Sequence, residues 1–231
     1  MKTNRLAFLE GIKDGIPIAL GYAAVAFSLG IAMRNADMNA LQGFLISLAN
    51  VASAGEYADL QVIAEDGAYI EIIIVTFVAN MRYLLMSTAL TQRFLRDTPF
   101  YHRFFVGYGV TDEIFGISIG HAKHIEPFYN YGAIVVSVPA WALGTSFGIL
   151  AGNILPSRIV SALSVALYGM FIAIIIPPAK ENPVTAGVVI SGFLLSWLTR
   201  NITLLSSGMK TIILTIFIAS IAAWRFPHEN A

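Results

Sequence analysis

Residues 51–92, VASAGEYADLQVIAEDGAYIEIIIVTFVANMRYLLMSTALTQ, carry polar and charged side chains inside stretches that are otherwise hydrophobic enough to dissolve in lipid. The four clearest examples are Glu56, Asp59, Asn80 and Arg82. A charge at bilayer depth is costly, so it is generally buried against protein or water and often lies on a substrate path. The run Ser53-Ala54-Gly55 interrupts the first apolar stretch, and a broken membrane helix is a frequent place for a binding pocket. We therefore predict a substrate site in this stretch.

The composition of the whole chain favours lipid as its main solvent. Its 231 residues are 57% hydrophobic and 12% charged, whereas an ordinary soluble domain has roughly 25% charged residues. The formal net charge is zero, so no bulk field attracts nucleic acid. The absence of cysteine excludes disulfides, cysteine-ligated metals and thiol catalysis. These features predict an all-α integral membrane protein with one transmembrane transporter domain over residues 1–231.

About six to eight hydrophobic segments are expected to enter or cross the bilayer. The first, Ile16 to Met33, reaches roughly 27 Å as a helix, which is enough to cross. Gly15-Ile16-Pro17 is a plausible start for it, because proline suits the first turn of a helix. The second is broken at Ala49-Asn50 and again at residues 53–55. After Ile16–Met33 the segments are Ala40–Ala64, Ala68–Gln92, Phe104–Gly120, Tyr131–Leu150, Ile159–Ile176, Val184–Leu198 and Met209–Trp224.

The distribution of basic residues indicates that two segments enter the membrane and return to the same side. Lysine and arginine gather on the cytoplasmic side, and we place the basic N-terminus there, in the cell membrane. If every segment crossed once, the basic loop 93–103 would lie outside. If residues 40–64 and 104–120 each dip in and return, this loop and both chain ends are cytoplasmic. The alternative for residues 40–64 is a kinked full crossing. The two broken segments are candidates for equivalents in an internal inverted repeat.

Arg82 lies close to the middle of the predicted helix Ala68–Gln92, so it needs a partner inside the protein. A guanidinium group binds a carboxylate bidentately, which suits the carboxylate of a substrate. The alternative is a structural ion pair with Glu56, Asp59, Asp112 or Glu113, and both hold if substrate exchanges with that acid. Asn80 suits either the polar groups of the substrate or an interhelical contact. The predicted substrate-binding residues are Arg82, Asn80, Ser53, Gly55, Glu56 and Tyr57.

Four carboxylates are candidates for proton coupling, namely Glu56, Asp59, Asp112 and Glu113. Glu56 and Asp59 are three residues apart, so a helix places both on one face. A helix that begins near mid-depth favours negative charge at its N-terminus, either Glu56 or a substrate carboxylate. A carboxyl group removed from water is a reasonable proton carrier. The alternatives are a helix-capping acid facing a lumen for Glu56, and solvated or Arg82-neutralising acids for Asp112 and Glu113.

The remaining polar residues predict no metal, no cofactor and no enzyme. The histidines do not form an HExxH motif, and His121 with His124 lacks an obvious third ligand. No P-loop, GxGxxG turn or Ser/His/Asp set is present. Glu65, Asp66 and Glu71 are interpreted as solvated charges at a segment end. Two rival functions stay open: a channel with two half-spanning segments, and a scaffold that only stabilises a small partner.

Five short motifs follow one another over nearly the whole chain: Gly11–Leu20 (GIKDGIPIAL), Ser53–Leu60 (SAGEYADL), Ala79–Leu85 (ANMRYLL), Thr111–Phe115 (TDEIF) and Ser206–Gly208 (SSG). In order and spacing they resemble the AzlC family of branched-chain amino-acid exporters. The resemblance implies a membrane permease subunit that expels branched-chain aliphatic amino acids. It also implies a small companion membrane protein of the AzlD type.

One motif departs from the family pattern. Where the family usually shows SAGQF, this chain has an acid and a tyrosine at Glu56 and Tyr57, and Asp59 stands where a small residue is common. Replacing a neutral amide by an acid beside the break is expected to alter substrate choice or the coupling ion. The resulting hypothesis is export by alternating access, with Arg82 on the substrate carboxylate, Asn80 on its polar groups and Glu56 as the proton carrier.

Overall fold

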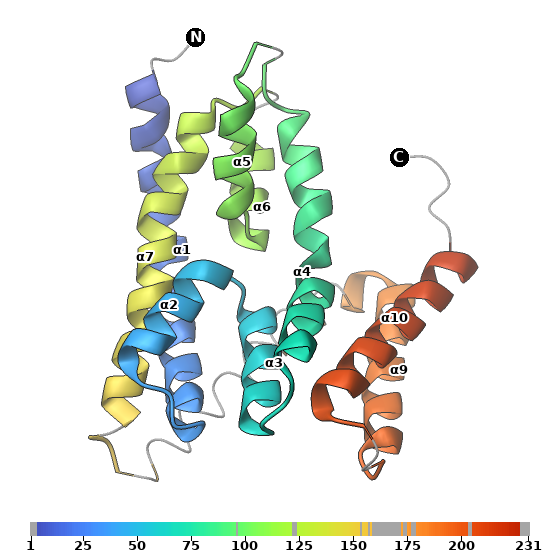
Figure 1. The fold of residues 1–231 in the computed structure, drawn as a ribbon. Coiled ribbons are helices and arrows are strands. Elements are labelled where there is room, and N and C mark those ends of the chain that lie inside the picture. The colour runs from blue at the N-terminus through green and yellow to red at the C-terminus, as the bar shows by residue number, and fades with distance from the viewer. Residues whose placement is uncertain are drawn as a thin grey trace.

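The protein is entirely helical over the residues that its computed structural model describes, as Figure 1 shows. These residues are 4–95, 97–121, 124–152, 154–156, 158, 172, 175–176, 179–202 and 205–226. Among them, four helices are long and apolar enough to cross a membrane, so the prediction of an all-α membrane protein is confirmed. The predicted segment 159–176 lies almost wholly outside the described residues. The four are α1 (Asn4–Asn35), α4 (Tyr69–Thr91), α7 (Pro127–Gly152) and α10 (Ser207–Arg225).

Helices α1 and α7 pack against each other along most of their lengths and form the most extensive helix contact among the described residues. Gly30 and Gly148 permit this contact, because a Cβ atom at either position would overlap the backbone of the opposite helix. Small residues allow membrane helices to approach closely where no water is available to drive them together. The predicted start at Pro17 is wrong, since α1 begins at Asn4 and continues through the proline. Neighbouring helices make such interior prolines tolerable in membranes.

The predicted segment 40–64 is a broken hairpin of two half-length helices. Helix α2 (Ala40–Asn50) has 11 residues and α3 (Ser53–Ala64) has 12, which corresponds to about 16–18 Å each. Ser146, near the end of α7, donates to the Ala40 carbonyl at 2.8 Å. Leu60, in the second half of α3, packs in the same apolar cluster as Met33 at the end of α1. Both outer ends of the hairpin therefore lie at one face, and its tip at Val51 and Ala52 reaches the interior.

A second half-length hairpin enters from the opposite face. It consists of α5 (Phe100–Tyr108) and α6 (Asp112–His121). Residues 109–111 join these helices and form the second tip. His102 lies 2.7 Å from the hydroxyl of Tyr131, in the second turn of α7. His121, at the end of α6, lies 3.5 Å from Glu10 near the start of α1. Figure 1 shows the two hairpins in opposite halves of the molecule, as an inverted repeat would arrange them.

Helix α10 is anchored on α3 and α4, next to α9 (Pro183–Thr199). Val62, Val75 and Ile212 form a small apolar cluster at this contact. Glu71, in the first turn of α4, accepts a hydrogen bond from the Met209 amide at 2.7 Å and another from the Ser206 hydroxyl. The interpretation of Glu71 as a solvated charge is therefore wrong, because it is buried and satisfies free amides at the start of α10.

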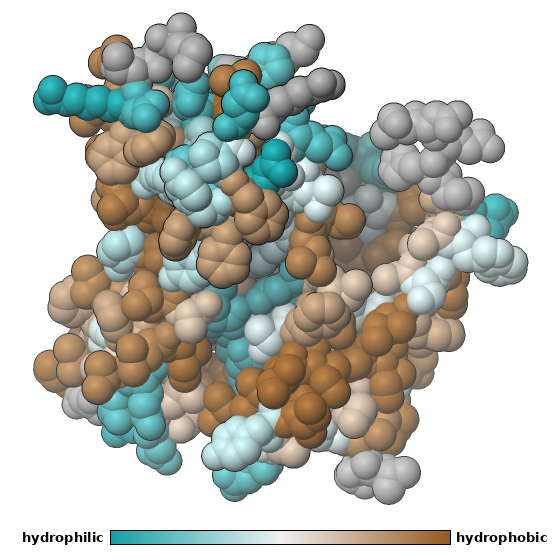
Figure 2. Space-filling view, turned by 45° about the horizontal axis from the view of Figure 1, so that its top comes forward, coloured by the Kyte–Doolittle hydropathy of each residue, from teal (hydrophilic) through white to brown (hydrophobic). Residues whose placement is uncertain are grey.

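The basic loop after α4 lies at the same end of the molecule as the start of α1. The Ile125 amide donates to the Arg93 carbonyl at 3.0 Å, and Ala7, Phe94 and Ile125 share one apolar cluster. This is the placement that the distribution of basic residues requires if residues 40–64 and 104–120 re-enter. Figure 2, in which this end is tilted forward, shows hydrophilic residues at this end, in the middle of the face and at its lower edge, with hydrophobic residues between them. That this end is cytoplasmic stays a prediction.

Candidate functional site

A cavity of about 400 Å³ lies where the tips of the two hairpins meet the middle of α1, α4 and α7. Its volume falls within the usual range for small-molecule sites. One side is apolar, with Pro17, Ile18, Gly21 and Val25 of α1 and Val51 of the first tip. Polar and aromatic side chains form the rest of the wall: Tyr22, Ser53, Arg82, Tyr83, Thr111, Asp112, Glu113 and Trp141.

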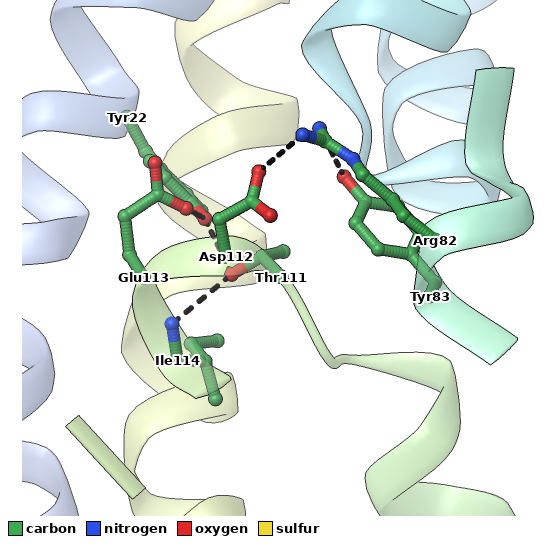
Figure 3. A network of polar contacts seen from close by, with 7 residues as sticks. All are labelled: Tyr22, Arg82, Tyr83, Thr111, Asp112, Glu113 and Ile114. Atoms are coloured by element: carbon green, nitrogen blue, oxygen red, sulfur yellow. Dashed lines mark hydrogen bonds and ion pairs between the residues drawn. The ribbon is translucent and has the colours of Figure 1, made fainter. Parts of the chain in front are cut away.

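Arg82 and Asp112 form an ion pair across this cavity, with Nη1 and Oδ2 2.7 Å apart (Figure 3). Arg82 comes from the middle of α4, and Asp112 is the first residue of α6. The guanidinium group also lies 5.1 Å from the ring centroid of Tyr83. Each side chain of the pair is 42% exposed, so neither is sealed inside protein. The pair is therefore open to a ligand that carries both charges.

Glu113 is held on the other side of the second tip by Tyr22 of α1 (Figure 3). The Tyr22 hydroxyl lies 2.6 Å from Glu113 Oε2 and 2.6 Å from Thr111 Oγ1, within hydrogen-bond distance of both. The Thr111 hydroxyl accepts in turn from the Ile114 amide at 3.3 Å, so it caps the first turn of α6. The second tip thus presents two carboxylates, one paired with a cation and one with a phenol.

Glu56 is fully buried outside the cavity, between α2, α3 and α7. Its Oε2 accepts from the Ser47 hydroxyl at 2.5 Å, and its Oε1 accepts from Trp141 Nε1 at 2.7 Å and the Ala52 amide at 3.3 Å. The bond from the Ala52 amide caps the start of α3, so the alternative prediction that Glu56 is a helix-capping acid holds in that respect. The side chain faces packed helices, however, and not a lumen. No ion pair joins Glu56 to a cation within the described part of the chain.

Asn80 and Asp59 belong to a separate polar chain behind the first tip. Asn80 donates to Asn50 at 2.8 Å, and Asn50 donates to Asp59 at 3.0 Å. The Thr76 hydroxyl donates to the other oxygen of Asp59. Gly55 packs against the Asn80 amide, where a Cβ atom would lie 2.9 Å from its oxygen. Asp59 lines a different cavity, of about 310 Å³, between the first hairpin and α4.

The structure therefore brings together only part of the predicted site. Arg82 and Ser53 line one cavity with Asp112 and Glu113. The other predicted residues do not line it: Asn80, Gly55, Glu56, Tyr57 and Asp59. The physical reason is the position of the break. The chain leaves the helical conformation at Val51 and Ala52, before the Ser53-Ala54-Gly55 run, so α3 already begins at Ser53 and turns the following side chains toward α2, α4 and α7.

Sequence reasoning missed the aromatic and hydroxyl partners of the cavity. Tyr22, Thr111 and Trp141 are buried; Tyr22 and Thr111 lie within hydrogen-bond distance of each other in the cavity wall, and Trp141 donates to Glu56 behind it. Buried tyrosine hydroxyls and tryptophan amines generally need a partner, which is a signal that a polar network lies nearby. Among the described residues, no three histidine or acidic side chains lie together in a way that could hold a metal ion.

Comparison with known proteins places the chain among membrane proteins. A family model described as AzlC protein matches residues 17–155, which include both hairpins and every residue that lines the cavity. The chain is 28% identical over 198 residues to an uncharacterized membrane protein of Archaeoglobus fulgidus, covering 85% of this chain and 87% of that protein. It is 24% identical over 151 residues to the inner membrane protein YgaZ of Escherichia coli, covering 63% and 61%. No solved structure matches. With this match, and with four helices in its described part that are long and apolar enough to cross a membrane, the chain belongs to the AzlC family of membrane proteins.

Proposed function

We propose that the chain is a permease subunit that exports branched-chain aliphatic amino acids across the cell membrane. The observation that carries this proposal is the Arg82–Asp112 ion pair in a cavity whose opposite wall is apolar. An amino acid presents a carboxylate, an ammonium group and a side chain, and the cavity offers a counterpart to each. Arg82 binds the carboxylate, Asp112 binds the ammonium group, and α1 contacts the aliphatic side chain.

The exchange of ion-pair partners is energetically feasible. A half-exposed ion pair contributes only about 0–1 kcal/mol, so separating it costs little. A zwitterion that enters between Arg82 and Asp112 gives each charge a new partner of opposite sign. Ser53, at the start of α3, adds a hydroxyl group on the same wall. The ligand therefore replaces an internal contact, and no buried charge is left unpaired.

The two hairpins provide a route for alternating access. Their tips are joined by a hydrogen bond from the Tyr108 hydroxyl to the Leu48 carbonyl. Because the hairpins enter from opposite faces, moving one of them opens the cavity to one side only. Glu56 is the proton carrier in this scheme. Membership of the family supports a small AzlD-type partner, for which the exposed apolar side chains of α4 and α10 leave ample lipid-facing surface.

Counterflow of radiolabelled leucine in proteoliposomes, with and without the small partner, tests the proposal. We expect saturable exchange that competes with valine and isoleucine and that requires a higher leucine concentration for half-saturation in Arg82→Ala. Arg200→Ala is the matched control, because Arg200 stacks on Trp197 at the end of α9 and does not line the cavity. Flux that leucine does not saturate would favour the channel. Absence of any flux with the partner present would favour the scaffold.

A further inference from the structure

We propose that Trp141 couples occupancy of the cavity to protonation of Glu56, through a hydroxyl chain that can reverse its direction. This inference rests on the proposed function and adds the path between the substrate and the proton. It gives roles to Trp141, Ser47 and Thr145, which no sequence motif had marked.

Trp141 has contacts on both sides of the cavity wall. Its side chain lines the cavity, where its ring meets Tyr22 edge-on with centroids 5.3 Å apart. Its Nε1 donates to Glu56 Oε1 at 2.7 Å. Among the described residues, Trp141 alone lines the cavity and also donates to Glu56. A ligand that displaces the indole therefore removes a donor from the carboxyl group.

Two hydroxyl groups connect the other oxygen of Glu56 back to the same tryptophan. Ser47 Oγ lies 2.5 Å from Glu56 Oε2 and 2.7 Å from Thr145 Oγ1, and Thr145 Oγ1 lies 3.3 Å from the Trp141 carbonyl. With Glu56 ionised, Thr145 donates to Ser47 and Ser47 donates to Glu56. With Glu56 protonated, both bonds reverse, so that Glu56 donates to Ser47 and Ser47 donates to Thr145. The Thr145 hydroxyl then donates to the Trp141 carbonyl. Every group in the chain keeps a partner in both states.

The surroundings of Glu56 make it a proton site. The helices packed on it present neutral groups: Ser47 from α2, Thr145 and Trp141 from α7, and Tyr22 of α1 beyond the indole. The charged neighbour is Asp59, one turn along α3, and it has the same sign. A buried carboxylate with no cation beside it is costly, and a proton removes that cost.

The geometry fixes the direction of the coupling. The ionised form of Glu56 has three donors, from Ser47, Trp141 and Ala52. If leucine displaces the Trp141 donor, the ionised form loses stabilisation and Glu56 takes up a proton from solvent. Because coupling is reciprocal, leucine then binds more tightly as pH falls.

The test measures protons directly in purified protein. Leucine is added to weakly buffered detergent solution with a pH indicator, and the carboxyl stretching band is followed by infrared spectroscopy during a pH titration. We expect proton uptake on leucine binding and a band that titrates in the wild type. Both are absent in Glu56→Gln. Trp141→Phe keeps a ring on the cavity wall but lacks the N–H, so the titration midpoint rises by about one pH unit. Trp197→Phe, on the exposed side of α9, is the control and behaves as the wild type.

The outcomes separate this inference from the proposed function. Leucine binding without proton uptake, measured with radiolabelled ligand in the same sample, overturns the coupling and leaves the permease intact. Absence of leucine binding ends the proposed function. Should Glu56→Gln fail to fold, Trp141→Phe still decides, because an unchanged midpoint excludes the indole as a donor that stabilises ionised Glu56.

Discussion

Replacing Arg82 by alanine is expected to weaken leucine binding by roughly tenfold. A hydrogen bond to a charged group contributes about 1.5–3 kcal/mol. The empty site already holds an ion pair with Asp112, and this pair, 42% exposed on both sides, offsets about 0–1 kcal/mol of the gain. The difference of about 0.5–3 kcal/mol corresponds to a rise in Kd of about 2- to 150-fold, with tenfold near the middle of that range.

Ligands with only one charge show whether the loss is specific. Isocaproate has the carboxylate and side chain of leucine without the ammonium group, whereas isoamylamine has the amine without the carboxylate. Arg82→Ala should weaken leucine and isocaproate, and it should strengthen isoamylamine because the Asp112 carboxylate loses its internal competitor. Asp112→Asn should weaken leucine and isoamylamine, and it should strengthen isocaproate because the guanidinium group loses its internal competitor.

The assay is competition against radiolabelled leucine on purified protein, with Arg200→Ala as the control for removal of a positive charge elsewhere. The exchange of partners is supported if Arg82→Ala loses affinity for isocaproate and Asp112→Asn loses affinity for isoamylamine. Equal loss of all three ligands in Arg82→Ala would show that the variant collapses the cavity. Unchanged affinity for isocaproate in that variant would remove Arg82 from the carboxylate site.

Three further substitutions test the architecture. Gly148→Ala should destabilise the protein in detergent by at least about 2 kcal/mol, measured as a lower thermal midpoint, because the added methyl group meets the backbone of α1. Gly116→Ala is the control and should be neutral or stabilising, because Gly116 faces open space on α6. Glu71→Ala should expose the start of α10 to limited proteolysis at a cost of about 1–2 kcal/mol, and Glu181→Ala, at an exposed position, should leave the cleavage pattern unchanged. Tyr108→Phe should speed hydrogen exchange at the end of α2 by about fivefold, and identical exchange would deny that the tips are joined.

The membrane architecture could be predicted because it depends on composition and charge distribution. The interrupted apolar run of residues 40–64 and the basic loop 93–103 together indicated a segment that enters and returns, and α2 and α3 confirm a broken helix there. Helix α4 spans Tyr69–Thr91, within one residue of the predicted Ala68–Gln92 at each end. Long apolar periodic stretches with few alternatives leave the chain little choice in lipid.

The position of the break could not be predicted from residue preferences. Val51 has φ 49° and ψ 38°, a left-handed conformation that β-branched residues rarely adopt. Gly55 would adopt the left-handed conformation freely, yet it lies inside the regular helix α3. There its missing side chain allows close approach to Asn80. At Val51, tertiary packing outweighs the conformational preference of the residue, as it does at strained functional positions in general.

The partner of Arg82 was predictable only as a choice among four acids. Glu56 and Asp59 were two of these acids, but the fold turns them behind the first tip and gives them hydroxyl, amide and indole partners. Asp112 reaches Arg82 because the second hairpin enters from the other face and ends beside α4. Pairing between α4 and the second hairpin is a property of the assembled bundle, and neither segment carries it alone.

The polar side chains of the site are the ones that half-length helices require. A helix that ends inside the bilayer leaves backbone groups without partners, and no water is available to satisfy them. Here Tyr108 binds the Leu48 carbonyl at the end of α2, Glu56 accepts the Ala52 amide at the start of α3, and Thr111 caps α6. Replacing such a residue by an apolar one would therefore damage the helix end, and for Thr111 the cavity wall as well. Arg82 is different, because its helix is continuous and needs no cap. Its internal partner is Asp112, and in the proposed function the substrate carboxylate replaces that partner, which makes Arg82 the most informative residue to change.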